Sequence, residues 1–205
     1  MKKFDISFYN EKIKIIAGVD EAGRGPLAGP VVAAAVVFQK DCFIPGVNDS
    51  KKLPATKREF YEKLIKEKAL SYGYGVVNEK EIDKINILQA SLKAMKIAVS
   101  KLCVKPDLIL IDGNKIFKSN IMALPIVKGD AKSFSIAAAS ILAKVKRDEI
   151  MKKAAKKYPE YFWEKNKGYG TKQHVEAIKI NGFTEMHRKT FLTKIAEKYF
   201  QEKLF

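Results

Sequence analysis

Acidic side chains follow three apolar runs in this basic chain, and their types and positions could support chemistry. The four acids are Asp20 and Glu21 after residues 15–19, Asp112 after 108–111, and Asp130 after 125–129. Ligands of open α/β sheets collect where strands give way to loops. We therefore expect these four carboxylates to converge on one site.

Carboxylates gathered in this way repel one another and raise one another's pKa unless a cation is present. Hard oxygen ligands select Mg²⁺ or Mn²⁺. A site with two such ions suits phosphodiester hydrolysis, because one ion activates water while the other stabilises the leaving oxygen. The acids therefore predict a divalent-metal cofactor, Mn²⁺ or Mg²⁺, with two ions in each active site.

Each acid also has a structural interpretation that the sequence leaves open. Asp130 precedes a long helical pattern and could be its N-cap. Asp112 and Gly113 form a common turn dipeptide. Asp20 and Glu21 are adjacent, so they point to opposite faces of an extended strand unless the backbone bends there.

A glycine-rich loop comes directly after the first acidic pair. Gly23 and Gly25 let the backbone approach a ligand and expose amide donors, and Arg24 between them can fork onto a phosphate. An ordinary turn with a surface arginine is the alternative. The glycine spacing matches neither a Walker loop nor a dinucleotide-binding fingerprint.

Two further loops offer contacts to nucleic acid. One sets the hydroxyl of Ser50 beside Lys51 and Lys52, ahead of a helix. These residues could bind the phosphate backbone, or the loop could be a helix start with solvated lysines. The other places Tyr169 between two glycines, where an exposed ring could stack on a sugar or base and a buried one would belong to the core.

The histidines and cysteines do not form a recognisable metal site. His174 and His187 lack the spacing of a metal pair, so we expect structural roles for both, although His187 and Arg188 could touch a phosphate. Cys42 and Cys103 are too few for a disulfide framework or a structural zinc site.

Composition indicates a folded protein with a polyanionic partner. The 205 residues include 39 Lys and Arg against 23 Asp and Glu, a net charge of +16, and 47% are hydrophobic. Such an excess favours nucleic acid or a membrane surface as the partner. The longest apolar run, 28–38, is too short to span a bilayer. No signal peptide is evident, so we expect a cytoplasmic protein without membrane association.

The elements expected from the pattern define a mixed α/β fold. Strands are expected at 14–19, 30–38, 71–77, 108–111 and 121–127, the last two buried on both faces. Helices are expected at 54–70, 86–102, 131–157, 171–180 and 190–203. Strands followed by strand–helix alternation predict one domain over residues 1–205, with a mixed sheet flanked by helices. A small helical C-terminal appendage is expected at roughly 158–205.

The ordered set of these segments resembles ribonuclease HII, the type 2 ribonuclease H family. The matching segments are 18–31 (GVDEAGRGPLAGPV), 48–53 (NDSKKL), 110–113 (LIDG), 128–130 (KGD), 135–144 (SIAAASILAK) with Arg147 and Asp148, 166–171 (NKGYGT) with His174, and 187–188 (HR). They cover about residues 13–191, nearly the whole chain. One segment would be weak support, but the ordered set is specific.

The resemblance implies a ribonuclease H-like fold and an endonuclease. Its substrates would be the RNA strand of RNA–DNA hybrids and single ribonucleotides within duplex DNA. Cleavage on the 5′ side of the ribonucleotide would leave 5′-phosphate and 3′-hydroxyl ends. Carried over by motif, the catalytic and metal-binding acids would be Asp20, Glu21, Asp112 and Asp130.

The same resemblance gives roles to two of the loops. Gly23, Arg24 and Gly25 would read the ribose 2′-hydroxyl, the group that distinguishes RNA from DNA. Tyr169 would stack on the sugar that follows the ribonucleotide. The related ribonuclease HIII type carries an extra N-terminal substrate-binding domain, for which the residues before Asp20 leave no room.

Two other functions stay open from the residues alone. A non-catalytic protein that binds RNA–DNA hybrids would have the same charge, with the acids serving as caps and turns. Another nuclease of the ribonuclease H fold, acting on DNA junctions, would have similar acids. We expect a monomer, and the end of the chain, 203–205, only suggests a peptide for a replication clamp.

Overall fold

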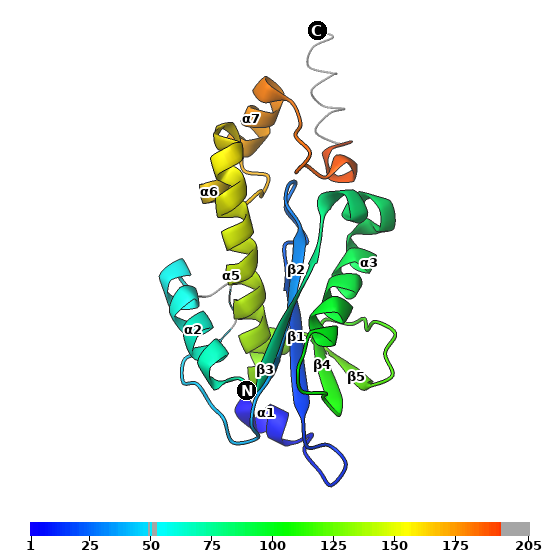
Figure 1. Ribbon diagram of the computed structural model, residues 1–205. Coiled ribbons are helices and arrows are strands. Elements are labelled where there is room, and N and C mark those ends of the chain that lie inside the picture. Colours follow the sequence, from blue (N-terminus) through cyan, green and yellow to red (C-terminus); the bar gives the residue numbers. More distant parts are fainter. Residues whose placement is uncertain (49, 51–52, 194–205) are drawn as a thin grey trace.

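The computed structural model describes residues 1–48, 50 and 53–193, and these form one sheet with helices around it (Figure 1). The strands are β1 (Ile16–Ala22), β2 (Val31–Val37), β3 (Ser71–Val77), β4 (Leu108–Asp112) and β5 (Met122–Ile126). The helices are α1 (Lys2–Ile6), α2 (Ala55–Lys68), α3 (Glu79–Ser100), α4 (Gly129–Lys132), α5 (Phe134–Lys157), η2 (Pro159–Tyr161), α6 (Trp163–Asn166) and α7 (Lys172–Asn181).

The sheet is mixed, with strand order β3-β2-β1-β4-β5. β1, β2 and β3 are antiparallel neighbours, whereas β4 runs parallel to β1 and β5 runs parallel to β4. Because β1, β4 and β5 run in the same direction, their carboxyl ends lie at the same edge of the sheet. The expected mixed α/β sheet is confirmed; the convergence of the four acids on one site stays a prediction.

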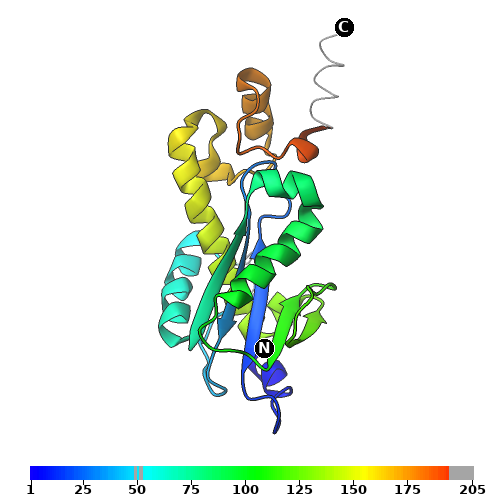
Figure 2. The same ribbon diagram turned by 45° about the vertical axis from the view of Figure 1, so that its right-hand side comes forward.

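Helices cover both faces of this sheet. α3 lies against one face, while α5, with α2 beside it, lies against the other (Figures 1 and 2). All seven residues of β2 are buried, because the strand is central and carries only valine and alanine. A central strand that is covered on both faces typically has such a continuous apolar sequence.

The start of α5 lies unusually close to β1. A side chain at Gly18 would collide with the backbone of Ser135, so only glycine allows this approach. From that contact, Asp20 lies two residues along the strand, about 6.6 Å. Ser140 lies five residues along the helix, about 7.5 Å. The contact therefore sets Ser140 of α5 level with Asp20 of β1.

Two sequence predictions were wrong: the burial of β5 on both faces and the residue at which the long helix begins. β5 is an edge strand with Met122 61% exposed, so it is not buried on both faces. The long helix begins at Phe134 and is capped by Ser133, whose side chain accepts a hydrogen bond from the Ile136 amide. Asp130 lies before it, in the separate short helix α4, and is therefore not the cap of α5.

α3 begins seven residues before the helix expected from the apolar spacing. Asn78 caps its first part, and Asn86 interrupts it with φ 66° and ψ 165°. The Asn86 side chain then accepts hydrogen bonds from the amides of Leu88 and Gln89, as an N-cap does. The apolar spacing identified the second part of α3, which starts at this inner cap.

Residues 158–193, which follow α5, pack around its far end (Figure 1). Tyr161, Trp163 and Ile178 form a hydrophobic cluster there with Met151 of α5. The helix expected from residue 190 is described only as far as residue 193. The division into a domain and an appendage stays a prediction. Among the described residues, no helix has both the length and the hydropathy needed to cross a membrane.

Candidate active site

Asp20 and Glu21 lie near the end of β1 and point to opposite faces of the strand, since their side chains alternate. Both are nearly buried: Asp20 is 5% exposed and the Glu21 side chain is 8% exposed. The Glu21 amide donates a hydrogen bond of 2.7 Å to Asp20 Oδ1. The two acids thus flank the strand end.

Asp112 ends β4, the strand beside β1, and is fixed by the turn that carries Asp130. The Gly129 amide donates a hydrogen bond of 2.6 Å to Asp112 Oδ1. Asp130 is the next residue, and its side chain is buried. Gly113 has φ 102°, so the turn expected after Asp112 is present as well.

The charges of the acids act on one another. Burial raises the pKa of Asp20 well above its ordinary value, the negative charges of Glu21 and Asp112 raise it further, and a hydrogen bond from Ser140 opposes them. Burial also raises the pKa of Glu21; the nearby Arg24 lowers it and the charge of Asp112 raises it. The charge of Asp112, at the end of β4, therefore raises the pKa of two acids that lie on opposite faces of β1.

These residues fit a hard divalent cation, although they are not gathered around one point. Glu21 Oε2 is buried without a hydrogen-bond partner, while Oε1 lies 3.3 Å from Arg24 Nη1. Within the described part of the chain, no three Asp, Glu, His or Cys side chains already lie close enough together to hold a metal ion. A cation would offset the repulsion that raises both pKa values, so the donor set suits Mg²⁺ or Mn²⁺.

The loop after β1 is held by Arg188, which is completely buried. Its guanidinium donates hydrogen bonds to the carbonyl oxygens of Gly23 (2.6 Å), Arg24 (3.0 Å) and Gly29 (2.7 and 2.9 Å). Burial lowers the pKa of Arg188 to about 9, and the neighbouring charge of Arg147 contributes. The carbonyls of this loop point inward to the guanidinium.

Arg147 of α5 holds the same loop from the other side. It donates hydrogen bonds to the carbonyls of Ala28 (3.0 Å) and Pro30 (3.0 Å), and to that of Lys167 (2.9 Å). Gly23 has φ 98°, and a side chain there would collide with Arg147. Both guanidiniums are bound by carbonyls, and neither forms an ion pair with any of the residues that the structure describes.

Tyr169 lies beside this loop and is 43% exposed, as the stacking interpretation requires. Lys144 Nζ lies 5.8 Å from the centre of its ring, and the Arg147 guanidinium carbon lies at 5.9 Å. The space next to Gly25 opens toward the ring: a Cβ at that glycine would lie 3.9 Å from Tyr169 Cε1.

The two histidines support the Tyr169 loop from behind and are buried, in agreement with the expected structural roles. The Trp163 indole donates to His174 Nε2 (3.0 Å), so His174 Nδ1 carries the proton that bonds the Tyr169 carbonyl (2.9 Å). His187 accepts a hydrogen bond from the Thr184 amide (3.0 Å). Neither His187 nor Arg188 is exposed for a phosphate.

The structure describes only part of the loop around Ser50. Its hydroxyl is buried and lies 2.8 Å from the Ser140 hydroxyl, so it faces the protein interior rather than a bound phosphate. Lys51 and Lys52 lie outside the described residues. Ser50 is thus linked through Ser140 to the Asp20 carboxylate.

Sequence reasoning did not assign roles to Arg58 and Ser140, or the loop-holding role to Arg147 and Arg188. One signal was available, because Arg147 lies two residues after the largely apolar stretch 136–145. A charged residue that continues such a run is buried only if it is bound. Its carbonyl partners, however, lie up to 119 residues away in the chain.

A mixed five-stranded sheet of this order, flanked by helices and carrying acids near the ends of two parallel neighbouring strands, has the ribonuclease H-like fold. The profile of the family described as ribonuclease HII matches residues 17–194. A ribonuclease HII of Caldanaerobacter subterraneus subsp. tengcongensis is 56% identical over 95% of this chain and 81% of its own length. The chain belongs to the ribonuclease HII family. It is a ribonuclease H, an endonuclease for RNA–DNA hybrids and for ribonucleotides in DNA.

Solved structures agree with this assignment. The crystal structure of ribonuclease H2 from Pyrococcus horikoshii superposes with a TM-score of 0.74 at 31% identity, covering 91% of this chain and 99% of that one. Bst-RNase HIII in complex with Mn²⁺ has a TM-score of 0.68 at 18% identity, covering 94% and 71%, and so shares the fold. Family membership favours the nuclease over the hybrid-binding and junction-cutting alternatives.

Proposed function

We propose that this ribonuclease HII cuts on the 5′ side of a ribonucleotide, using divalent cations held by Asp20, Glu21, Asp112 and Asp130. The products carry 5′-phosphate and 3′-hydroxyl ends. The observation that carries this proposal is the raised pKa of two buried acids near the end of β1. Burial and the charges of Glu21 and Asp112 raise the pKa of Asp20, and burial and the charge of Asp112 raise that of Glu21.

The four acids hold the cations and the rest of the site places the substrate. Bound divalent cations supply activation of the attacking water and stabilisation of the leaving oxygen. Glu21 Oε2, buried without a hydrogen-bond partner, is an oxygen that a cation would satisfy. The Mn²⁺ bound by Bst-RNase HIII supports a role for this ion or for Mg²⁺ here.

The Gly23-Arg24-Gly25 loop recognises the ribose 2′-hydroxyl. Its carbonyls are taken by Arg188, which leaves backbone amides for a ligand on the other side. Arg24 is 53% exposed at its side chain, and its contact with Glu21 leaves further donors for a phosphate. Tyr169, half-exposed beside the loop, stacks on the next sugar.

One experiment tests the proposal. A DNA duplex with a single ribonucleotide is incubated with the protein and Mn²⁺, Mg²⁺ or a chelator, and the cut is mapped on a sequencing gel. We expect metal-dependent cleavage on the 5′ side of the ribonucleotide, and none of an all-DNA duplex. Cleavage in chelator, or on the 3′ side, would contradict the proposal.

A further inference from the structure

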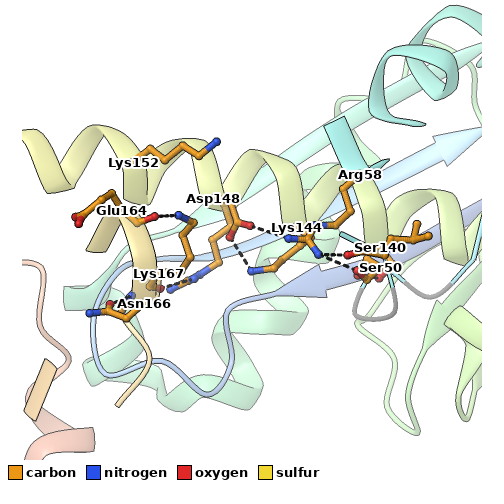
Figure 3. Close-up of polar contacts among 12 residues, drawn as sticks. Ser50, Arg58, Ser140, Lys144, Asp148, Lys152, Glu164, Asn166 and Lys167 are labelled. Carbon is orange, nitrogen blue, oxygen red and sulfur yellow. Dashed lines mark hydrogen bonds and ion pairs between the residues drawn. The ribbon is translucent and has the colours of Figure 1, made fainter. Parts of the chain in front are cut away.

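Asp148 of α5 lies between two cations that come from different parts of the fold (Figure 3). Its Oδ1 lies 2.7 Å from Lys144 Nζ, one turn earlier on the same helix. Its Oδ2 lies 3.6 Å from Arg58 Nη2, on α2. The three side chains are largely buried, with exposed fractions of 11% for Asp148, 19% for Lys144 and 14% for Arg58.

Arg58 connects Asp148 to the loop that contains Ser50. Arg58 Nη1 donates hydrogen bonds to the carbonyl oxygens of Ser50 (3.1 Å) and Leu53 (2.6 Å). Ser50 in turn touches Ser140, the hydroxyl that bonds the Asp20 carboxylate. One oxygen of Asp148 is therefore connected, through Arg58 and two serines, to an acid of the candidate active site.

Lys144 connects Asp148 to the exposed ring of Tyr169. Lys144 Nζ lies 5.8 Å from the centre of the Tyr169 ring, on a side chain long enough to adopt many other rotamers. The carboxylate holds the ammonium in this place. The other oxygen of Asp148 is therefore connected, through Lys144, to the Tyr169 ring.

We propose that Asp148 is a positioning residue for cleavage, which fixes Ser50 against Ser140 through Arg58 and Lys144 against the Tyr169 ring. This inference rests on the proposed function of Asp20 and Tyr169. Arg58 also bonds the carbonyls of Ser50 and Leu53, so Asp148 fixes these bonds relative to α5; the Lys144 side chain is intrinsically flexible and pairs with Asp148 on its own helix. A carboxylate between them fixes both, because a buried charge without its partner is strongly unfavourable.

A second ion pair provides a matched control. Lys152 of α5 and Glu59 of α2 pair at 3.0 Å, so they join the same two helices without touching the Ser50 loop or the Tyr169 ring. Glu59 and Asp148 line one groove with a volume of about 690 Å³. Asp148→Asn and Glu59→Gln therefore each remove one negative charge from the same surface and one link between the same helices.

The variants are compared by kcat, KM and melting temperature on a duplex with one ribonucleotide. We expect Asp148→Asn to lower kcat about tenfold or more without raising KM, since small displacements of reacting groups cost up to about 100-fold. We expect Glu59→Gln to keep kcat within about twofold, as surface pairs contribute little. Equal kcat for the two variants would overturn the proposal.

A double-mutant cycle tests the path through Arg58. If Asp148 acts through Arg58, the losses of kcat in Asp148→Asn and Arg58→Lys are less than additive when combined; full additivity would overturn this path. Arg58→Lys keeps the positive charge but loses the planar guanidinium with its several donors. If Asp148→Asn does not fold, the kcat of Arg58→Lys alone tests the proposal. Asp20→Asn is assayed in parallel: its retained cleavage would refute the proposed function, whereas its inactivity beside a fully active Asp148→Asn would refute only this inference.

Discussion

The backbone amide of Leu27 donates a hydrogen bond of 2.8 Å to the carbonyl oxygen of Gly168, and so ties the loop after β1 to the loop of Tyr169. The Ala28 amide donates to the same oxygen at 3.3 Å. The loop proposed to read the 2′-hydroxyl and the ring proposed to stack on the next sugar are therefore held in fixed relation before any substrate binds.

The ring of Tyr169 is expected to act by stacking. Tyr169→Ala should lower kcat/KM on a single-ribonucleotide duplex about tenfold, because stacking on an aromatic contributes about 1–3 kcal/mol. Tyr169→Phe keeps the ring and should stay near the wild-type value. Steady-state cleavage assays of the two variants separate the ring from the hydroxyl, and an equal loss in both would refute the stacking role.

Asp20→Asn should abolish cleavage. We expect a loss larger than about 100-fold, since residues that merely support metal ligands cost about 10–100-fold when removed. The fold should persist, because asparagine can still accept the hydrogen bond from the Glu21 amide. Circular dichroism confirms the fold, and metal-dependent cutting by this variant would remove Asp20 from the catalytic set.

The same substitution should raise the melting temperature in chelator at pH 7. The pKa of Asp20 is raised in the folded state by burial and by the charges of Glu21 and Asp112. Its contribution to stability is thus present below the unfolded pKa and is lost as pH rises toward the folded pKa. At neutral pH the uncharged amide removes this cost. Thermal scans should also show that Mn²⁺ stabilises the wild type more than the variant.

Arg188→Lys should destabilise the fold and loosen the loop after β1. Lysine keeps a charge but cannot reach three carbonyls with a planar fork, and each unsatisfied buried group costs about 1–3 kcal/mol. We expect a loss of about 2 kcal/mol or more in urea unfolding, together with a larger fall in cleavage of single ribonucleotides. Lys153→Arg, on the exposed part of α5, is the control and should change neither.

Mild acid should lower the stability of the fold through the buried His187, which lies in the region that supports the Tyr169 loop. Burial lowers the pKa of His187 to about 4 from an ordinary 6.5, and the proximity of His174 contributes. The unfolded state therefore binds the proton first, so stability is lost as pH falls from about 6.5 toward about 4. Urea midpoints across this range should fall for the wild type, and less for His187→Phe.

The sequence predicted more of the fold than of the side chains that hold the site loops in place. β3 was placed at its observed bounds and β4 to within one residue, because their patterns are local signals. The end of β1 was placed at residue 19, but the strand continues to Ala22 and contains Asp20 and Glu21. The edge position of β5 depends on which strands pair with it, which its own residues do not encode. The part of α3 before Asn86 was missed, because the apolar spacing that predicted the helix begins only at Leu88.

The candidate acids were visible because each follows an apolar run. The roles of Arg58, Arg147 and Arg188 were not, because they donate their hydrogen bonds to backbone carbonyls, which carry no residue type in the sequence. Ser140 was likewise part of a recognised motif, but its contacts with Ser50 and Asp20 depend on the close approach of α5 to Gly18.

The hold of Arg188 on the loop after β1 has a consequence for how the protein is made. Its carbonyl partners lie 159 to 165 residues earlier in the chain, so the loop near the start of the chain takes its shape only after the last described segment has emerged. Contacts of such long sequence separation form late, because a long chain must first close on itself. We therefore expect the growing chain on the ribosome to remain unable to recognise its substrate until Arg188 has emerged.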